Sequence, residues 1–427
     1  MHYFPITPRL QRLFMSRHTS KDMRWHKEER VDIDDELRHP ADGEAWKDFD
    51  NQYPIFAKEA RNVRLGLATD GFNPFGDLSN SYSMWPVMLV QYNMPPWKCM
   101  REEFIMMSLL IPGRKAPGKD IDIYLQPLIE ELKELWSNGV NTYDLVENNY
   151  FTMRAAVLWT INDFPAYGTI SGYSTSGYKA CPVCADETSS FRIRSRISFM
   201  GHRRYLPLHP SWRKSKEYDG RVENRIPPKT LSGEDILKKL NSIWKGQPGK
   251  NEKIQEIDKN MMCKEGYTNY SNWRRKSILW ELEYWPKLKL RHTLDVMHIE
   301  KNICDALVGT ILNIEGKSKD NEKARLDLQD LKIRKELHLQ VKGNKFVKPA
   351  ACYTLSENER ESFCKFLKSV KFPDGYAANI SRNVNIKEGK ITGFKSHDCH
   401  VLLQRLLHVG LRPYLKKKVI SPIAEVS

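Results

Sequence analysis

The chain has 427 residues, with 68 Lys and Arg against 53 Asp and Glu, which gives a formal net charge of +15. Apolar residues make up 40% of the sequence and aromatic residues 11%, a composition that excludes an intrinsically disordered protein. The 8 cysteines are too sparse for a disulfide scaffold and indicate a reducing compartment. No apolar run is long enough for a signal peptide or a membrane span, so we expect no membrane partner. The basic excess favours a polyanionic partner such as nucleic acid, although it also serves plain solubility.

Residues 1–60 are polar and irregular, which predicts an extended N-terminal arm or a small appendage. The pattern changes at Arg61, because apolar residues then alternate with others at 63, 65 and 67, as in a half-buried strand. Further apolar runs at 84–92 and 104–111 follow after short loops and predict two more strands. Three strands joined by short loops are most simply an antiparallel meander.

A helix is predicted after residue 120, because the apolar residues of 121–136 recur at helical spacing over four turns. Asp120 or Asp122 can cap its first turn. We expect Pro127 only in the first turn, so that the regular helix begins later than the apolar pattern. Asn138 and the glycine after it mark its end.

The apolar run 151–161 predicts a fourth strand, covered on both faces. Since the helix crosses over, this strand can lie parallel beside the first strand of the meander. Asp70 ends the first strand and Asp163 follows the fourth, so the two carboxylates would lie side by side at one end of the sheet. The predicted fold class is therefore α/β with a ribonuclease-H-like mixed sheet.

Two neighbouring carboxylates repel each other and stay ionised together mainly around a divalent cation. A pair of Mg²⁺ or Mn²⁺ ions about 4 Å apart can activate a nucleophile and stabilise the leaving oxygen in phosphoryl transfer. Asp70 and Asp163 are our candidate metal-binding acids. The alternative is that each is a turn or cap residue, which is a common use of Asp.

Cys181 and Cys184 form a CxxC pair, which has the spacing of half a tetrahedral zinc site. Unpaired structural cysteines and a redox pair are the alternatives. Further zinc ligands would come from a histidine, and the candidates nearest in sequence are His202, His209, His292 and His298.

Residues 201–260 hold 14 Lys and Arg against 8 Asp and Glu, a net charge of +6, and aromatic residues are interleaved with the charges. Basic side chains contact phosphates and aromatic rings stack on exposed bases, so this stretch is a candidate DNA-binding insertion. A solvated basic loop is the alternative. The candidate DNA contacts are Arg203, Arg204, Arg213, Lys214 and Lys216.

A second apolar block begins at residue 280, and a helix is predicted after Asp295, which is a suitable N-cap. Asp295, His298 and Glu300 lie in its first two turns and could bind metal or DNA, or could simply cap and pack. Residues 316–337 read as a charged helix or hinge, and the leucines of 397–418 predict a C-terminal helix with a basic end.

Six long segments, taken together, resemble the transposases of plant CACTA (En/Spm-type) DNA transposons. They are LGLATDGFNPF (65–75), IPGRKAPGKDIDIYLQPLIEELKELW (111–136), WTINDFPAYGTISGYSTSGYKACPVC (159–184), MGHRRYLP (200–207), LDVMHIEKNICDALVGTILNIEGKSKD (294–320) and KSHDCHVLLQRLL (395–407).

This resemblance implies a DDE-type catalytic core that cuts and joins DNA at terminal inverted repeats with Mg²⁺ or Mn²⁺. Asp70 and Asp163 match the first two catalytic acids, and Cys181 and Cys184 match a structural zinc pair. The resemblance also implies a nuclear location and self-association or association with another transposon-encoded protein.

The third acid and a zinc-binding histidine pair usually lie downstream of the HDCH motif at 397–400 in this family. Here we expect the chain to represent a truncated central region, with Glu300 as the candidate third acid and His298 as a further zinc ligand. The expected parts are an arm (1–60), a core with the CxxC (61–200), a mostly helical basic insertion (201–280), a helical block (281–340) and a C-terminal helical segment (341–427).

Three functions are compatible with these features. The first is metal-dependent cleavage and transfer of transposon DNA, in which this fragment need not be active alone. The second is a catalytically dead relic that binds DNA or a partner. The third is an unrelated ribonuclease-H-like nuclease that prefers RNA–DNA hybrids.

Overall fold

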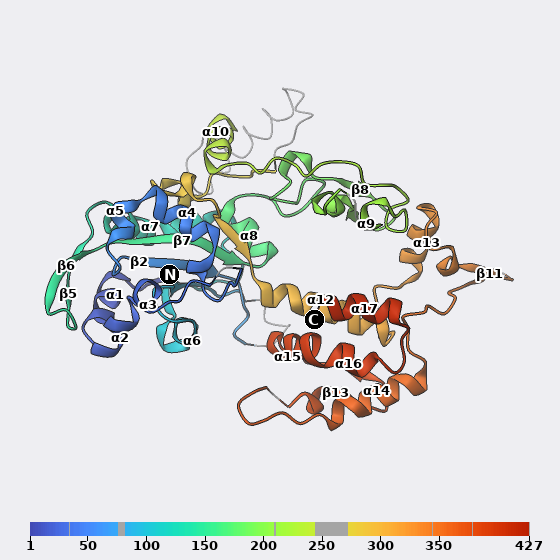
Figure 1. Cartoon of the computed structure of the whole chain (residues 1–427). Helices are drawn as coiled ribbons and strands as arrows, with labels where there is room; N and C mark the ends of the chain where they lie inside the picture. The colour runs from blue at the N-terminus through green and yellow to red at the C-terminus, as the bar shows by residue number, and fades with distance from the viewer. Residues whose placement is uncertain are drawn as a thin grey trace. The chain divides into compact units, whose positions relative to one another are not determined.

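In the computed structural model the chain forms two compact units, and Figure 1 shows the elements of both. The first unit comprises Met1–Glu187 and Lys229–Leu294, and the second comprises Thr188–Pro228 and Asp295–Ser427. The structure describes residues 1–33, 35–75, 82–208, 211–243, 272–343, 345–377 and 379–426.

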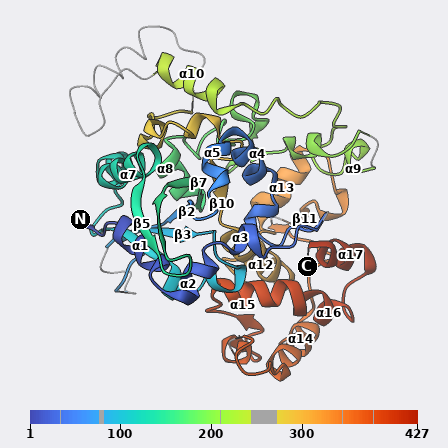
Figure 2. The same cartoon turned by 60° about the vertical axis from the view of Figure 1, so that its left-hand side comes forward.

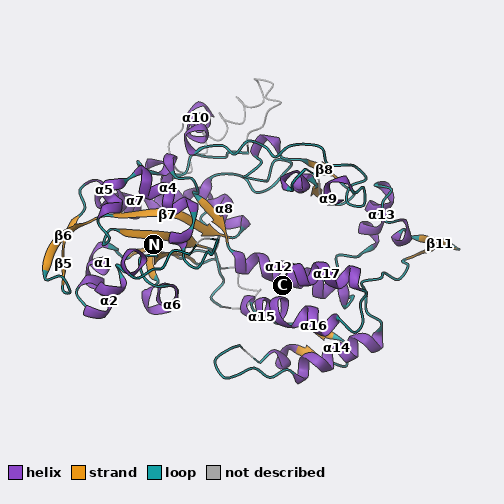
Figure 3. Ribbon diagram, viewed as in Figure 1, coloured by secondary structure: helices purple, strands orange, loops and turns teal. Residues whose placement is uncertain are grey.

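The first unit is built on a mixed sheet of six strands in the order β1-β4-β3-β2-β7-β10 (Figure 3). Neighbours from β1 to β2 are antiparallel, whereas β7 is parallel to β2 and β10 is parallel to β7. This confirms the predicted α/β class and the mixed sheet. The strands are β1 (His2–Tyr3), β2 (Val63–Thr69), β3 (Trp85–Gln91), β4 (Met106–Ile111), β7 (Ala155–Asn162) and β10 (His292–Leu294).

The central strands β2 and β7 are buried along almost their whole length, which explains why β7 is apolar nearly throughout. A bulge interrupts their pairing between Leu65 and Gly66. The ring of Tyr92 lies so close to Gly66 that a Cβ there would be 2.3 Å from the hydroxyl oxygen. Glycine is therefore required at this point of the central strand.

The predicted helix is α7 (Ile121–Ser137), which packs its apolar stripe into the core beside β7. The expectation for Pro127 is corrected, because the helix begins at Ile121 and contains this proline in its interior. The buried stripe of the helix outweighs the lost backbone hydrogen bond. Asn138 is the C-cap, as predicted.

Residues 1–60 pack into the same core and do not form an extended arm. Ile6, Leu10 and Phe14 are completely buried in it. The helices of this segment are α1 (Thr7–Phe14), α2 (Arg17–Asp22), α3 (Trp25–Glu28), α4 (Glu44–Gln52) and α5 (Pro54–Lys58).

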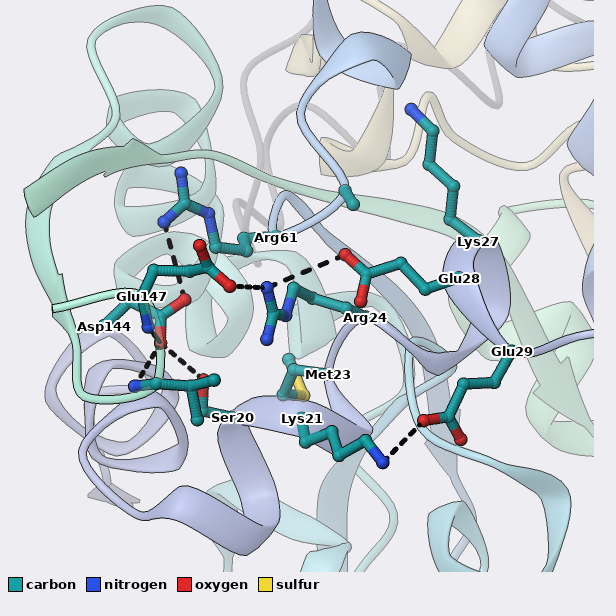
Figure 4. Close-up of polar contacts among 12 residues, drawn as sticks. Ser20, Lys21, Met23, Arg24, Lys27, Glu28, Glu29, Arg61, Asp144 and Glu147 are labelled. Carbon is teal, nitrogen blue, oxygen red and sulfur yellow. Dashed lines mark hydrogen bonds and ion pairs between the residues drawn. The ribbon is translucent and has the colours of Figure 1, made fainter. Parts of the chain in front are cut away.

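A polar network fixes these N-terminal helices to a hairpin formed by β5 (Val140–Asp144) and β6 (Asn149–Met153) (Figure 4). Ser20 Oγ donates to Asp144 Oδ1 at 2.6 Å, and Arg61 Nη1 lies 3.4 Å from Asp144 Oδ2. The guanidinium of Arg24 pairs with Glu147 in the turn of the hairpin. The apolar run 151–161, predicted as a single strand, spans the end of β6 and most of β7.

The second unit has its own core, formed mainly by the helices around α12 (Figure 2). A π-helical stretch, Leu402–Leu407, joins α15 to α16. Its helices are α9 (Ser211–Lys214), α12 (Val296–Ile311), α13 (Glu322–Asp330), α14 (Glu357–Ser369), α15 (Ser396–Val401), α16 (His408–Leu411) and α17 (Lys417–Val426).

Three small hairpins complete the second unit: β8 (Ser190–Arg192) with β9 (Ile197–Phe199), β11 (Gln340–Lys342) with β12 (Lys345–Val347), and β13 (Val384–Asn385) with β14 (Lys390–Ile391). The first unit further contains α6 (Pro96–Cys99), α8 (Phe164–Ser171) and α10 (Gly233–Ile243).

The unit boundaries differ from those expected from sequence, because the basic stretch is shared between the units. The chain leaves the first unit after Glu187, returns at Lys229 and leaves again after Leu294. Among the helices that the structure describes, none is long and apolar enough to cross a membrane.

Candidate functional site

Asp70 and Asp163 follow directly after the last residues of β2 and β7. These strands are parallel, and their register pairs Ala68 with Ile161, two residues before each acid. Asn162 Nδ2 donates to the carbonyl oxygen of Thr69 at 2.7 Å and joins the two strand ends. Neighbouring strands lie about 4.8 Å apart, so the two acids stand side by side at one edge of the sheet. The parallel pairing predicted from sequence is confirmed.

Each acid also has a local structural role. Asp163 is half-buried and its Oδ1 accepts a hydrogen bond from the backbone N–H of Ala166 at 2.7 Å, so it is the N-cap of α8. Asp70 is exposed, and its Oδ1 accepts from the N–H of Gly71 at 2.6 Å. A carboxylate has two oxygens and about four lone-pair positions, so the cap bond to Ala166 uses a fraction of the capacity of Asp163.

The surroundings of the pair fit a divalent cation. Asn162, the last residue of β7, is buried, and its Oδ1 has no hydrogen-bond partner within the described residues, so an uncharged oxygen donor is present at the end of the strand that Asp163 follows. Oxygen atoms of this kind are the ligands that Mg²⁺ and Mn²⁺ take. Sequence analysis missed Asn162, although the strand-ending Asn-Asp pair was visible.

Two aromatic side chains flank the acids and are exposed. Phe72 lies two residues after Asp70 and is 49% exposed, and Phe164 follows Asp163 and is 41% exposed. A Cβ at Gly71 would lie 2.5 Å from Trp85 Nε1, so glycine is required for the chain to turn beside that ring. Exposed aromatic rings next to acidic groups can stack on unpaired nucleobases.

Glu300 lies on α12 in the second unit. Asp295 caps this helix as predicted, accepting from the N–H groups of Met297 at 2.9 Å and His298 at 3.4 Å. Glu300 Oε2 lies 2.5 Å from His400 Nδ1, and Gln404 Nε2 donates to Glu300 Oε1 at 3.4 Å.

The four residues of the HDCH motif have separate contacts. His400 pairs with Glu300, while Asp398 Oδ2 accepts from the N–H of Lys395 at 2.9 Å at the start of α15. Cys399 is completely buried in the core of the second unit, whereas His397 is exposed.

Cys181 and Cys184 are half-buried in the first unit, and the N–H of Cys184 points to Cys181 Sγ at 3.4 Å. Burial raises the pKa of the Cys181 thiol. Within the described ranges, no group of three or more His, Cys, Asp and Glu side chains has the geometry of a metal site. The zinc pair therefore stays a prediction.

The histidines considered as further zinc ligands differ in their surroundings. His292 is a half-buried residue of β10, and its Nδ1 lies 2.7 Å from Thr160 Oγ1 on β7, so its ring is engaged within the sheet. Burial and the neighbouring Arg291 lower the pKa of His292 to about 3. His202 and His298 belong to the second unit, and His209 lies outside the described residues.

Three of the five basic residues assigned to DNA are buried. Arg203 is 2% exposed, donates to the carbonyl oxygen of Ser215 at 2.8 Å and pairs with Asp219 at 2.6 Å. Arg213 is equally buried and donates to the carbonyl oxygens of Arg204 and Leu206 at 2.8 and 2.9 Å. Their guanidinium groups therefore hold the loop together in this structure, and a phosphate contact from them stays an untested prediction.

Arg204 is also buried, at 4% exposure, whereas Lys214 and Lys216 are exposed. Trp212 is 47% exposed and stacks on Tyr218 at a ring distance of 6.3 Å. The DNA contact thus stays a prediction, and the exposed Lys214 and Lys216 are the candidates that can reach a phosphate in this structure.

Comparison with known proteins bears on the same region. Residues 34–243 match the model of a family described as transposase family tnp2. The match covers just under half of the chain and includes both acids and the CxxC pair, and it supports assignment to a transposase family. No curated protein matches the chain.

Proposed function

We propose that this transposase-like chain cuts and joins DNA at the terminal inverted repeats of a CACTA-type (En/Spm-type) transposon. The observation that carries the proposal is the pair Asp70 and Asp163, placed in register after two adjacent parallel strands. The family match over the same residues supports it. Such a protein acts on DNA in the nucleus, so we propose a nuclear location.

The fold supports the same reading. An antiparallel meander followed by parallel strands on one side, in the order β4-β3-β2-β7-β10, is compatible with a ribonuclease-H-like sheet. In such a sheet the acids belong at the ends of the strands that come first and fourth among these in chain order, which are β2 and β7 here. We therefore propose this fold for the first unit.

Asp70 and Asp163 would hold Mg²⁺ or Mn²⁺, with Asn162 Oδ1 as a neighbouring oxygen donor. A bound ion would supply charge neutralisation at the phosphate and acidify the attacking hydroxyl or water. The cap bond from Ala166 holds one oxygen of Asp163 in place before any ligand arrives. Phe72 and Phe164 would position DNA by stacking on bases at the opened end.

We propose Glu300 as the third acid, from the resemblance of the HIEKN segment and from its position six residues after β10. Cys181 and Cys184, with His298, are proposed zinc ligands. The proposed partners are terminal-repeat DNA and a second transposon-encoded chain, which includes another copy of this one.

The cleavage activity can be tested with purified full chain, a duplex that carries a terminal inverted repeat, and Mg²⁺ or Mn²⁺. Asp70→Asn and Asp163→Asn should each abolish cleavage while DNA retention in a gel shift stays unchanged. Asp374→Asn is the control, because Asp374 is an exposed aspartate of the second unit. Cleavage that survives both substitutions in the pair would refute the assignment.

A non-catalytic DNA-binding relic is the second candidate. The Glu300–His400 pair favours it, because the proposed third acid already has a partner within its own unit. This function predicts metal-independent DNA binding and no cleavage by the wild-type chain in the same assay. An RNA–DNA hybrid run beside the DNA duplex tests for a ribonuclease preference.

A further inference from the structure

The second unit contains an apolar groove of about 740 Å³ that the proposed chemistry does not use. Its floor comes from α12, α13 and α17, with a wall from the β8–β9 hairpin. The apolar lining residues are Ile193, Met200, Ala306, Leu307, Ile311, Ala324, Leu328, Leu331, Ile333, Val419, Pro422 and Ile423. A groove with this lining favours an apolar ligand surface.

Four basic residues stand around this floor: Arg196, Lys319, Arg334 and Lys418. All four are exposed, and none forms an ion pair with any residue that the structure describes. The groove therefore combines an apolar floor with an uncompensated basic rim.

Two acids in the groove do not cancel the basic rim, since both have partners. Asp320 Oδ2 accepts from Arg325 Nη2 at 2.7 Å, and Asp327 Oδ1 accepts from the N–H of Arg194 at 3.0 Å. The ligand that fits has apolar side chains with acidic groups beside them. Nucleic acid fits less well, because phosphates would meet the rim but nothing would cover the floor.

The first unit carries a segment of that chemistry, here called the acidic segment (residues 31–33 and 35–37). Its apolar side chains point to solvent, with Val31 71%, Ile33 39% and Leu37 80% exposed. Asp32 and Glu36 alternate with them along the chain. Exposed apolar residues set among acids match the floor and the rim of the groove.

The acids of this segment have surface partners that they can exchange. Asp32 lies 3.4 Å from Arg30 and 3.6 Å from Lys47, and Glu36 lies 2.9 Å from Arg38. The Asp32–Lys47 and Glu36–Arg38 pairs are exposed on both sides, and ion pairs of this kind contribute little, about 0–1 kcal/mol. Replacing them by the rim cations therefore costs little, while burial of three apolar side chains favours docking.

We propose that the acidic segment of one copy docks in the groove of a second copy of this chain. Its apolar side chains cover the floor made by α12, α13 and α17, and its carboxylates face Lys319 and Lys418 on the rim. Because one copy contributes its groove and the other its acidic segment, the contact is head-to-tail and leaves one groove and one acidic segment of the pair open to a further copy. The inference does not depend on catalytic activity.

The first test uses a fluorescein-labelled synthetic peptide of residues 28–40 and the full chain, followed by fluorescence anisotropy. We expect binding with a dissociation constant of about 10–100 µM, which weakens as salt is raised. Lys319→Glu with Lys418→Glu should weaken binding at least about tenfold. The matched control is Lys342→Glu with Lys368→Glu, which changes charge equally at exposed lysines outside the groove lining and should bind as the wild type does.

A second test separates docking between copies from docking within one copy. Sedimentation velocity should show association that increases with concentration and is lost in Val31→Ser with Leu37→Ser, both at exposed positions. The idea is overturned if the peptide does not bind, or if the rim and control variants bind it equally. A third outcome also overturns the proposal: the wild-type chain stays monomeric at every concentration, and the Val31→Ser, Leu37→Ser variant binds added peptide more tightly than the wild type does. That result would mean that the acidic segment occupies the groove of its own chain.

Discussion

His400 Nδ1 lies 2.5 Å from Glu300 Oε2, and this contact joins two motifs that are 100 residues apart in the chain. One motif is HIEKN on α12, and the other is HDCH on α15. The Glu300 side chain is 17% exposed, so solvent screens the contact incompletely. The histidine therefore fixes the direction in which this carboxylate points.

If Glu300 is the third acid, His400 is a positioning residue. Glu300→Gln should abolish cleavage, whereas His400→Ala should lower the rate about 10–100-fold, the usual cost of losing a supporting contact. The half-saturating Mn²⁺ concentration should rise in His400→Ala, which a merely structural role would not cause. His397→Ala is the matched control, because it is an exposed histidine of the same motif. An unchanged Mn²⁺ dependence in His400→Ala would exclude the positioning role.

A second prediction concerns the buried ion pair between Asp122 on α7 and Arg275. Asp122 is 3% exposed, and its Oδ1 also accepts from the N–H of Ile278 at 3.1 Å. Asp122→Ala leaves the guanidinium buried without its partner, so it should lower the free energy of unfolding by about 3–5 kcal/mol. Urea unfolding of the full chain measures this loss.

The control for this pair is Glu130→Ala, at an exposed position of the same helix, which should change stability by less than about 0.5 kcal/mol. Burial raises the pKa of Asp122 despite the nearby Arg275, so the carboxyl is strongly desolvated. Equal losses for the two substitutions would show that the pair does not hold α7 in place.

The sequence predicted the elements whose pattern is local and missed those that depend on distant partners. The stripe of α7 was predictable because burial of one helix face imposes a period. The strand β2 was predictable from its alternating apolar residues, although the structure buries both of its faces. The start of β7 could not be predicted from the sequence, because it depends on a distant partner. The backbone N–H of Arg154 donates to Asn62 Oδ1 at 2.8 Å, and this contact separates β6 from β7. β10 has three residues and no period to detect.

The charge pattern also did not reveal that Arg203 and Arg213 are buried, because burial depends on contacts outside the local sequence. A run of basic residues indicates net charge but not burial, and the carbonyl groups that receive Arg203 and Arg213 come from residues 204–225 of the same loop. Pro127 was misplaced because tertiary packing outweighs helix propensity. The pairing of Asp70 with Asp163 was predictable, since the short loops and the crossover leave few topologies.

The third prediction concerns pH. The pKa of His292 is lowered to about 3, first by burial and then by Arg291, so the folded chain holds this ring neutral. Below the ordinary histidine pKa of about 6.5, the unfolded chain binds a proton that the folded chain does not. The contribution of His292 to the free energy of unfolding is therefore fully present above about pH 6.5. As the pH drops from there toward 3, the free energy of unfolding falls by about 1.4 kcal/mol per pH unit.

His292→Asn keeps a polar group near Thr160 and removes this titration. The difference in unfolding free energy between pH 7 and pH 5 should shrink in this variant by an amount on the order of 2 kcal/mol. His18→Asn, at an exposed histidine, should leave the difference as in the wild type. If His292→Asn has the same pH dependence as the wild type, the ring titrates normally in the fold.

The fourth prediction concerns zinc. The chain purified without chelator should contain about one zinc ion, bound through Cys181 and Cys184. Cys181→Ser should lose it, and Cys352→Ser should retain it, because Cys352 is an exposed free cysteine outside the pair. His298→Gln tests the proposed third ligand in the same metal analysis. Equal zinc content in the wild type and Cys181→Ser would remove this site from the proposal.

The last prediction separates the exposed lysines from the buried arginines. Lys214 and Lys216 are exposed, so changing both to Ala should weaken DNA binding and reduce the slope of log affinity against log salt by about 1–2. Arg203→Ala should instead destabilise the second unit, because it removes donors to Ser215 and to Asp219. Fluorescence anisotropy from about 50 to 200 mM salt gives the slope, and thermal melting gives the stability.

Two outcomes would contradict this assignment. If Arg203→Ala melts as the wild type does and reduces the salt slope as much as the lysine variant does, this arginine contacts phosphate and its buried position does not persist in the complex. An unchanged slope in the lysine variant, with a normal melt, would place the DNA contact elsewhere on the chain.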